Sequence, residues 1–125
     1  MRRTLLFAAL AVAAAAAATP ASAQYPSRAV TLVVGFAPGG GTDTVARVVQ
    51  RPLGERLGQQ VVVDNKPGAG GNIATNMVAK SAPDGLTVML ANVGSLTVAP
   101  HLQKDLPYDP MKDLAPVSMG VIFPN

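Results

Sequence analysis

Residues 29–43 read Ala-Val-Thr-Leu-Val-Val-Gly-Phe-Ala-Pro-Gly-Gly-Gly-Thr-Asp, and this stretch decides the fold. Its first part, 29–36, is an apolar, β-branched run without alternation, which is typical of a strand buried on both faces of a parallel sheet. Residues 37–41 end that strand with a proline and three glycines. Thr42-Asp43 then offers a helix N-cap. The stretch therefore predicts a strand, a glycine-rich turn and a helix in direct succession.

The helix predicted after Asp43 has one apolar and one polar face. Pro52 lies within it and should kink it, because proline has no N–H and its ring crowds the preceding turn. Gly58 is a suitable C-terminal stop. The predicted apolar stripe consists of Val45, Ala46, Val48, Val49, Leu53 and Leu57, and the polar face of Arg47, Gln50, Arg51 and Arg56.

The same order of elements then repeats along the chain. A second strand is predicted at 61–64, a second glycine-dense turn at 65–71, and a helix at 73–80 that Asn72 caps. Pro83-Asp84-Gly85 is a turn, because it combines a fixed φ, a side-chain acceptor and a permissive residue.

A third strand at 86–91 leads into the polar turn 92–95, and helical turns from Ser95 are expected to stop at Pro100. Leu106 to Pro110 reads as a rigid linker, 111–114 as a short segment, and Val117 as the start of a fourth strand. This order predicts a doubly wound, mostly parallel α/β sheet with right-handed crossovers.

Residues 1–23 have the charged, apolar and Ala-x-Ala parts of a cleavable signal peptide. The apolar run 5–18 is too short for a spanning helix, which needs about 20 residues. Cleavage after Ala23 removes Arg2 and Arg3 and lowers the formal net charge from +3 to +1. A chain so near neutrality, without a basic cluster, is not expected to bind nucleic acid or an anionic membrane. The absence of cysteine excludes disulfides and thiolate zinc sites.

The chemistry is expected at the carboxyl ends of the strands, where ligands of such sheets bind. Residues 38–43 and 67–72 place backbone N–H groups at helix N-termini, which favour an anion, and glycine lets a ligand approach the main chain. The alternative is that the glycines only make tight turns and the polar residues only cap helices. Replacing Gly40 or Gly70 by Val should separate the two, since a binding loop would lose its ligand before its fold.

Motifs of nucleotide binding and catalysis are absent from the sequence. Neither glycine turn continues into Gly-Lys-Ser/Thr, and the positions of Thr44 and Ile73 lack the third glycine of a dinucleotide fingerprint. His101 is the only histidine, and no nucleophile elbow or His-Glu-x-x-His occurs. We therefore expect neither an enzyme nor a metal or other cofactor.

Five ordered motifs together resemble the Bug family, the periplasmic solute receptors of tripartite tricarboxylate transporters. The motifs are Tyr-Pro-Ser-Arg at 25–28, Pro-Gly-Gly-Gly-Thr-Asp at 38–43, Asn-Lys-Pro-Gly-Ala-Gly-Gly-Asn at 65–72, Pro-Asp-Gly at 83–85 and Leu-Pro-Tyr-Asp-Pro at 106–110. The resemblance implies a type II periplasmic binding protein that closes two lobes around a small carboxylate and passes it to membrane transporter subunits. It also implies a periplasmic monomer.

Carried over by motif, the ligand-binding residues lie in all three loops: Ala37, Gly39, Gly40, Gly41, Thr42 and Asp43 in the first, Gly68, Ala69, Gly70 and Gly71 in the second, and Asn92, Ser95 and Thr97 in the third. Residues 24–125 would form the N-terminal α/β lobe, with the family's second lobe missing after Asn125. Two alternatives stay open. One is a truncated or decayed half-receptor without transport activity. The other is an anion-binding enzyme domain whose catalytic residues lie in a missing portion.

Overall fold

The computed structural model of the chain describes residues 24–120. The expected signal peptide at 1–23 and the end of the expected fourth strand, at 121–125, lie outside the described residues. The elements in chain order are β1 (Val30–Val34), α2 (Gly41–Leu57), β2 (Val61–Asn65), the 3-10 turn η1 (Ala69–Gly71), α3 (Asn72–Ala79), β3 (Thr87–Leu90), the π-helical η2 (Gly94–Val98), α4 (Ala99–Leu102) and α5 (Pro110–Asp113).

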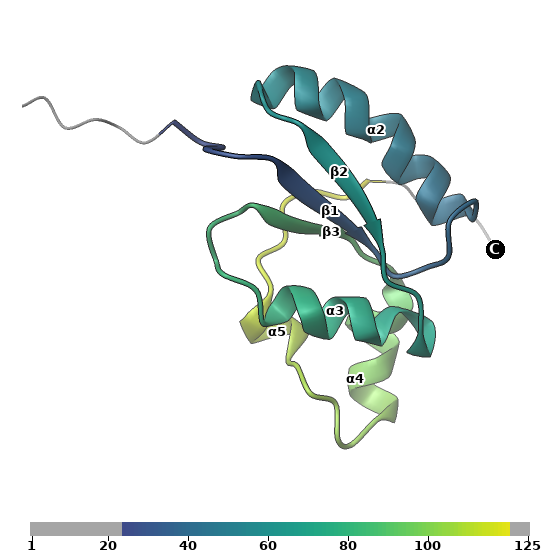
Figure 1. Cartoon of the computed structure of the whole chain (residues 1–125). Coiled ribbons are helices and arrows are strands. Elements are labelled where there is room, and N and C mark those ends of the chain that lie inside the picture. The colour runs from purple at the N-terminus through teal and green to yellow at the C-terminus, as the bar shows by residue number, and fades with distance from the viewer. Residues whose placement is uncertain (1–23, 121–125) are drawn as a thin grey trace, which may run out of the picture.

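The three strands form one parallel sheet in the order β2-β1-β3. The chain passes from β1 to β2 through α2 and returns to β3 through α3, and these two helices lie on opposite sides of the sheet (Figure 1). This is the doubly wound α/β arrangement that the order of elements predicts. β1 lies in the centre of the sheet, as its apolar sequence requires.

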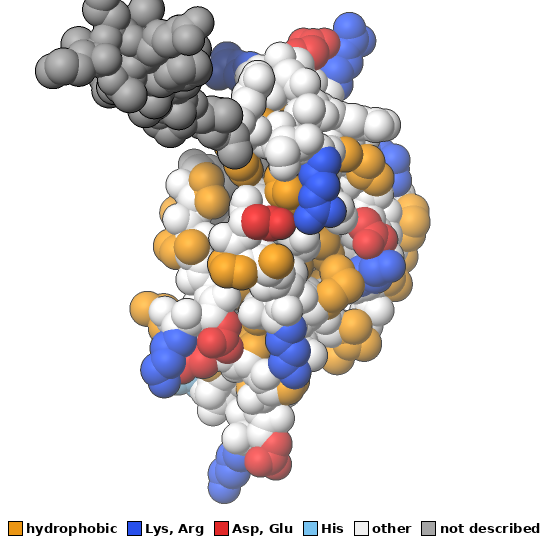
Figure 2. Space-filling model, turned by 60° about the vertical axis from the view of Figure 1, so that its left-hand side comes forward, with side chains coloured by type: hydrophobic (Ala, Val, Ile, Leu, Met, Phe, Trp, Pro, Cys, Tyr) orange, Lys and Arg blue, Asp and Glu red, His pale blue; other side chains and the backbone are white. Residues whose placement is uncertain are grey.

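The core lies around β1, where Val30, Val33 and Val34 are at most 1% exposed. Leu32, Ala46, Val61 and Leu86 complete the buried apolar cluster. Burial of a central strand on both faces explains why its sequence is a continuous apolar run. Over the surface visible in Figure 2, basic and acidic side chains are interspersed and form no large patch of one sign.

Helix α2 differs from its predicted pattern. Val48 is 71% exposed and Val49 is 42% exposed, so these two residues do not belong to the buried stripe. Gln50, expected on the polar face, turns toward the sheet and donates from Nε2 to the Val61 carbonyl oxygen at 2.7 Å. The reason is that β2 lies at the edge of the described sheet, where a polar side chain on α2 can bond to a carbonyl group that no neighbouring strand serves.

The ends of the helices also differ from the prediction. Gly40 is the N-cap of α2, and Thr42 and Asp43 lie inside its first turn. The helix continues past Pro52 to Leu57 and ends at Gly58, whose φ of 66° confirms the predicted stop. Gly71 is the N-cap of α3, so Asn72 does not cap it.

The segment after β3 contains more helix and less strand than predicted. Helical structure continues from η2 through Pro100 into α4, because Pro100 stands in the first turn of α4, where a missing N–H is tolerated. Within 117–120 no strand forms; these residues are exposed and pair with no strand of the described sheet. Among residues 24–120, no helix is long and apolar enough to cross a membrane.

Candidate functional site

The candidate site lies where the strands end and the three predicted loops begin. The chain leaves β1 through 35–40, β2 through 66–71 and β3 through 91–93. Since the connections after β1 and β3 depart from neighbouring strands, their loops flank the point at which a doubly wound sheet binds ligands. The structure thus brings the three predicted loops to the carboxyl ends of the parallel strands, as the order of elements predicts.

The first loop presents the N-terminus of α2 to solvent. The Gly40 N–H donates to the Ala37 carbonyl oxygen at 3.4 Å, and the Thr44 N–H donates to the Gly40 carbonyl oxygen at 2.9 Å. Between them, the N–H groups of Gly41, Thr42 and Asp43 have no acceptor among the described residues. Three unpaired donors at the positive end of a 17-residue helix favour an anion.

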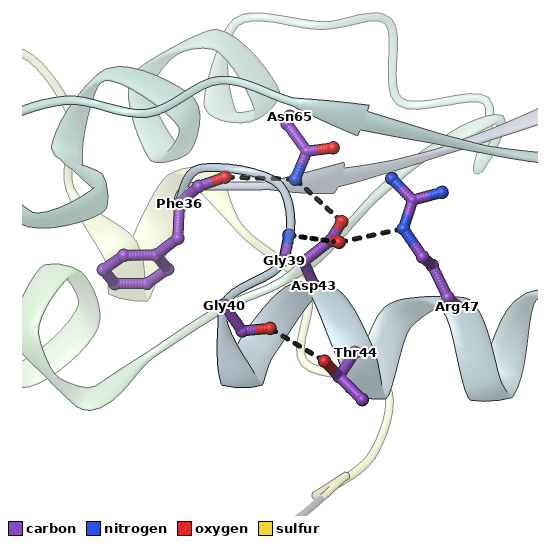
Figure 3. A network of polar contacts seen from close by, with 7 residues as sticks. All are labelled: Phe36, Gly39, Gly40, Asp43, Thr44, Arg47 and Asn65. Carbon is purple, nitrogen blue, oxygen red and sulfur yellow. Dashed lines mark hydrogen bonds and ion pairs between the residues drawn. The ribbon is translucent and has the colours of Figure 1, made fainter.

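The Asp43 carboxylate organises this loop from the inside (Figure 3). Its Oδ2 accepts from the Gly39 N–H and from Arg47 Nε, both at 2.8 Å, and its Oδ1 accepts from Asn65 Nδ2 at 3.0 Å. Asn65 Nδ2 also donates to the Phe36 carbonyl oxygen at 3.0 Å. Asp43 therefore ties the loop after β1 to the end of β2.

Asp43 remains ionised at neutral pH although the residue is only 2% exposed. The hydrogen bond from Arg47, followed by those from Gly39 and Asn65, lowers the pKa of this carboxyl from 3.8 to about 2. The side chain is thus saturated by the protein's own donors. At this position the carboxylate is engaged within the protein, and the main-chain N–H has no acceptor among the described residues.

The second loop is compact and close to its neighbours. The Gly71 N–H donates to the Gly68 carbonyl oxygen at 2.9 Å. Gly71 itself has a φ of 98°, and a Cβ at this position would stand 2.7 Å from Asn92 Nδ2. Both features require glycine at position 71. Ala69 and Gly70, in contrast, are exposed and accessible from solvent.

The third loop contacts the second through Asn92. Its Nδ2 donates to the Gly70 carbonyl oxygen at 3.4 Å, and its Oδ1 accepts from the Ser95 N–H at 3.0 Å. Ser95 is completely buried, and its hydroxyl donates inward to the Asn92 carbonyl oxygen at 3.4 Å. Thr97 is exposed on η2, and its carbonyl oxygen lies 2.7 Å from His101 Nδ1. The loops after β2 and β3 therefore meet at Asn92 and Gly70, and Ser95 is buried beside them.

Two residues of these networks were not singled out from the sequence. Asn65 joins the first and second loops, and Tyr108 lies behind the third, where its hydroxyl is 2.7 Å from the Ser95 carbonyl oxygen. Both belong to the five ordered motifs, but Asn65 was placed in a turn and Tyr108 in a linker. The available signal was a polar residue directly after a buried strand and a tyrosine between two prolines.

Two hollows of the described surface lie away from the three loops. One is lined by residues between Gln50 and Val61, and another by the N-terminal arm with Asp84 and Leu86. Both are at the amino ends of the strands, since the Val30 N–H donates to the Gln60 carbonyl oxygen there. Among residues 24–120, no group of His, Cys, Asp or Glu is arranged to hold a metal ion.

Comparison with known proteins agrees with this architecture. Solved structures with the same fold are periplasmic binding proteins, so the chain contains part of one α/β lobe of that class. Residues 45–124 match the family described as "Tripartite tricarboxylate transporter family receptor", and the chain belongs to this family.

Individual relatives define the extent of the match. BugT of Bordetella pertussis is 46% identical over 121 residues, which cover 95% of this chain and 37% of BugT. MatC of Rhodopseudomonas palustris, solved with bound malate, is 45% identical with a TM-score of 0.67 over 71% of this chain and 30% of MatC. The periplasmic binding protein BugD is 46% identical, with a TM-score of 0.68. The match covers 71% of this chain and 29% of BugD. The chain thus spans about a third of the length of these relatives.

Proposed function

We propose that this chain supplies the first lobe of a periplasmic receptor that binds a small carboxylate. The observation that carries the proposal is the set of three unpaired N–H groups, from Gly41, Thr42 and Asp43, at the sheet edge where such folds bind ligands. MatC was solved with malate, and another Rhodopseudomonas palustris protein, 40% identical to this chain, was solved with adipate. Both molecules are dicarboxylates, which supports the ligand class.

In this proposal the ligand carboxylate accepts hydrogen bonds from the first turn of α2. The exposed main chain of Ala37, Gly39 and Gly40 lines the approach, and the loop residues around Gly70 and Asn92 stand on the other side. A single lobe covers only one side of a solute, and burying most of the solute surface requires a second wall. We therefore infer that binding uses two lobes, of which residues 24–125 supply one.

Calorimetry with the receptor as its own cell produces it tests this proposal. Malate, adipate and citrate should be titrated separately, with the uncharged diamide of succinic acid as the control. We expect at least one carboxylate to bind and to raise Tm, since a ligand that binds only the folded state stabilises it by mass action. Failure of every carboxylate, or equal binding of the diamide, contradicts the ligand class.

We further propose that the receptor is exported by a signal peptide at 1–23 and delivers its solute to membrane transporter subunits without transforming it. The motif at 1–23 and the family membership support this proposal. N-terminal sequencing of the periplasmic protein should begin at Gln24. Solute added to the purified receptor should be recovered unchanged. Deleting the gene should reduce uptake of that solute by intact cells. A retained Met1, a converted solute or undiminished uptake would contradict the respective part.

A further inference from the structure

Tyr108 is buried at the back of the third loop. The residue is 6% exposed, and its hydroxyl lies 2.7 Å from the Ser95 carbonyl oxygen and 3.0 Å from Asn72 Oδ1. Burial raises the pKa of Tyr108, so the hydroxyl keeps its proton at neutral pH. A tyrosine hydroxyl has one hydrogen, which these two acceptors share, and the shorter contact, with the Ser95 carbonyl oxygen, is the stronger one.

The Ser95 carbonyl group has lost both backbone donors that a helix would offer it. The Ala99 N–H, its partner in an α-helix, donates to the Gly94 carbonyl oxygen because η2 is π-helical. The next donor, in the π pattern, would come from residue 100, which is proline and has no N–H. Since a buried carbonyl group without a partner is destabilising, the Tyr108 hydroxyl completes this turn.

The rest of the network connects Tyr108 to the second loop. Asn72, directly after Gly71, donates from Nδ2 to Gln103 Oε1 at 3.2 Å, and its Oδ1 faces the Tyr108 hydroxyl. Asn92 links Ser95 to Gly70, as described above. The chain directly after Tyr108 is held as well, because Asp109 caps α5 by accepting from the Met111 N–H at 3.0 Å.

We propose that Tyr108 is a positioning residue of the carboxylate site: its hydroxyl holds η2 in the π-helical form and thereby sets the place of Asn92 against the second loop. Tyr108 itself touches no ligand, and it acts through the Ser95 carbonyl group. This inference rests on the proposed function for its effect on binding, whereas its effect on η2 is independent of any ligand.

The test compares Tyr108→Phe with the wild-type receptor, both as the native cell produces them. We expect Kd for the best carboxylate among malate, adipate and citrate to rise about tenfold or more. In hydrogen exchange, the Ser95 and Ala99 amides should exchange about tenfold faster. Tyr25→Phe is the matched control, because its exposed hydroxyl also donates to a backbone carbonyl oxygen, that of Gly85 at 2.8 Å, but far from the loops. It should leave Kd and both exchange rates unchanged.

A double variant separates the hydrogen bond from packing. Pro100→Ala supplies the missing N–H at the position from which a π-helix donates to Ser95, so Tyr108→Phe should do less harm in that background. If Tyr108→Phe fails to fold, recovery of folding in the double variant would also show that the Ser95 carbonyl group needs a hydrogen-bond donor.

Unchanged Ser95 and Ala99 exchange in Tyr108→Phe, or no recovery with Pro100→Ala, overturns the inference. Altered exchange with an unchanged Kd overturns its binding part. If the wild-type receptor binds none of the three carboxylates, the proposed function fails, and the exchange rates still decide whether Tyr108 holds η2.

Discussion

At the scale of single residues, Asp43 gives the first loop its shape. Its carboxylate accepts from Gly39, Arg47 and Asn65, which belong to the loop, the helix and the end of β2. An amide cannot replace it, because its NH₂ group would face donors. We expect Asp43→Asn to lower Tm by about 5 °C or more, measured by thermal unfolding at pH 7. Glu55→Gln is the control, since it breaks an exposed pair with Arg51 at 2.9 Å and should change Tm by less than about 1 °C.

The same carboxylate makes stability depend on pH in the acid range. Because its pKa falls from 3.8 to about 2 on folding, the unfolded chain binds the proton more readily. The stabilisation is therefore complete above about pH 4 and is lost as pH falls from 3.8 through 2. Wild type should lose more Tm over this window than Asp43→Asn; Asp84 and Asp109, whose pKa values are also lowered, contribute to both proteins alike. Parallel Tm curves would contradict the assignment.

At the scale of elements, the glycines of the first and second loops differ in what they tolerate. Gly40 has extended backbone, with φ −76° and ψ 171°, and an added Cβ would meet only the Ala37 carbonyl oxygen at 3.5 Å. Gly70 has a φ of 64°, which a β-branched residue avoids. Gly40→Val should thus lower affinity about tenfold or more with little change in Tm, whereas Gly70→Val should lower both. Calorimetry and thermal unfolding of each variant check this, and full binding by Gly40→Val would favour a turn without a ligand.

Helix α2 contains an avoidable loss of stability at Pro52. The Val48 carbonyl group, four residues earlier, cannot receive an N–H from this position. Val48 is 71% exposed, so water can serve that carbonyl group and the helix continues. We expect Pro52→Ala to stabilise the fold by about 1–3 kcal/mol in urea unfolding. Pro110→Ala should give no gain, because Pro110 begins α5, where proline is favoured. An equal gain at both positions would contradict this account.

The sequence was sufficient to predict most helices and strands, but not where the helices begin and end, nor the hydrogen bonds between the loops. The apolar run of β1 and the turn residues after each strand were sufficient to predict the doubly wound order, whereas the ligand site at the carboxyl ends of the strands stays a prediction. The apolar stripe predicted for α2 was wrong at Val48 and Val49, which are exposed. The contact of Gln50 with an edge-strand carbonyl group depends on the sheet order, which the sequence does not give. Ser95 was expected to contact a ligand, but the residue is completely buried in this structure. No local pattern signals the hydrogen bond of its carbonyl group with Tyr108, 13 positions away.

At the scale of the whole molecule, the charge at the candidate site is balanced. The Asp43 carboxylate near the open N–H groups is paired with Arg47 at 2.8 Å. Arg47 is half exposed and its pKa is raised by that same partner, so neither group changes charge near neutrality. Under the proposed function, recognition of an anion by this lobe would rest on main-chain and amide donors, whose strength does not vary with pH.

This balance predicts that the affinity for a dicarboxylate is nearly constant around neutral pH. For adipate, Kd should change by less than about threefold between pH 6.5 and 8, since carboxylic acids with ordinary pKa values near 4 are fully ionised there. Calorimetry in buffers of equal ionic strength measures this. The sequence has one histidine, His101, next to the Thr97 carbonyl oxygen. A steep pH dependence that disappears in His101→Gln would show that an ionised side chain, and not the N-terminus of α2, carries the recognition of the carboxylate.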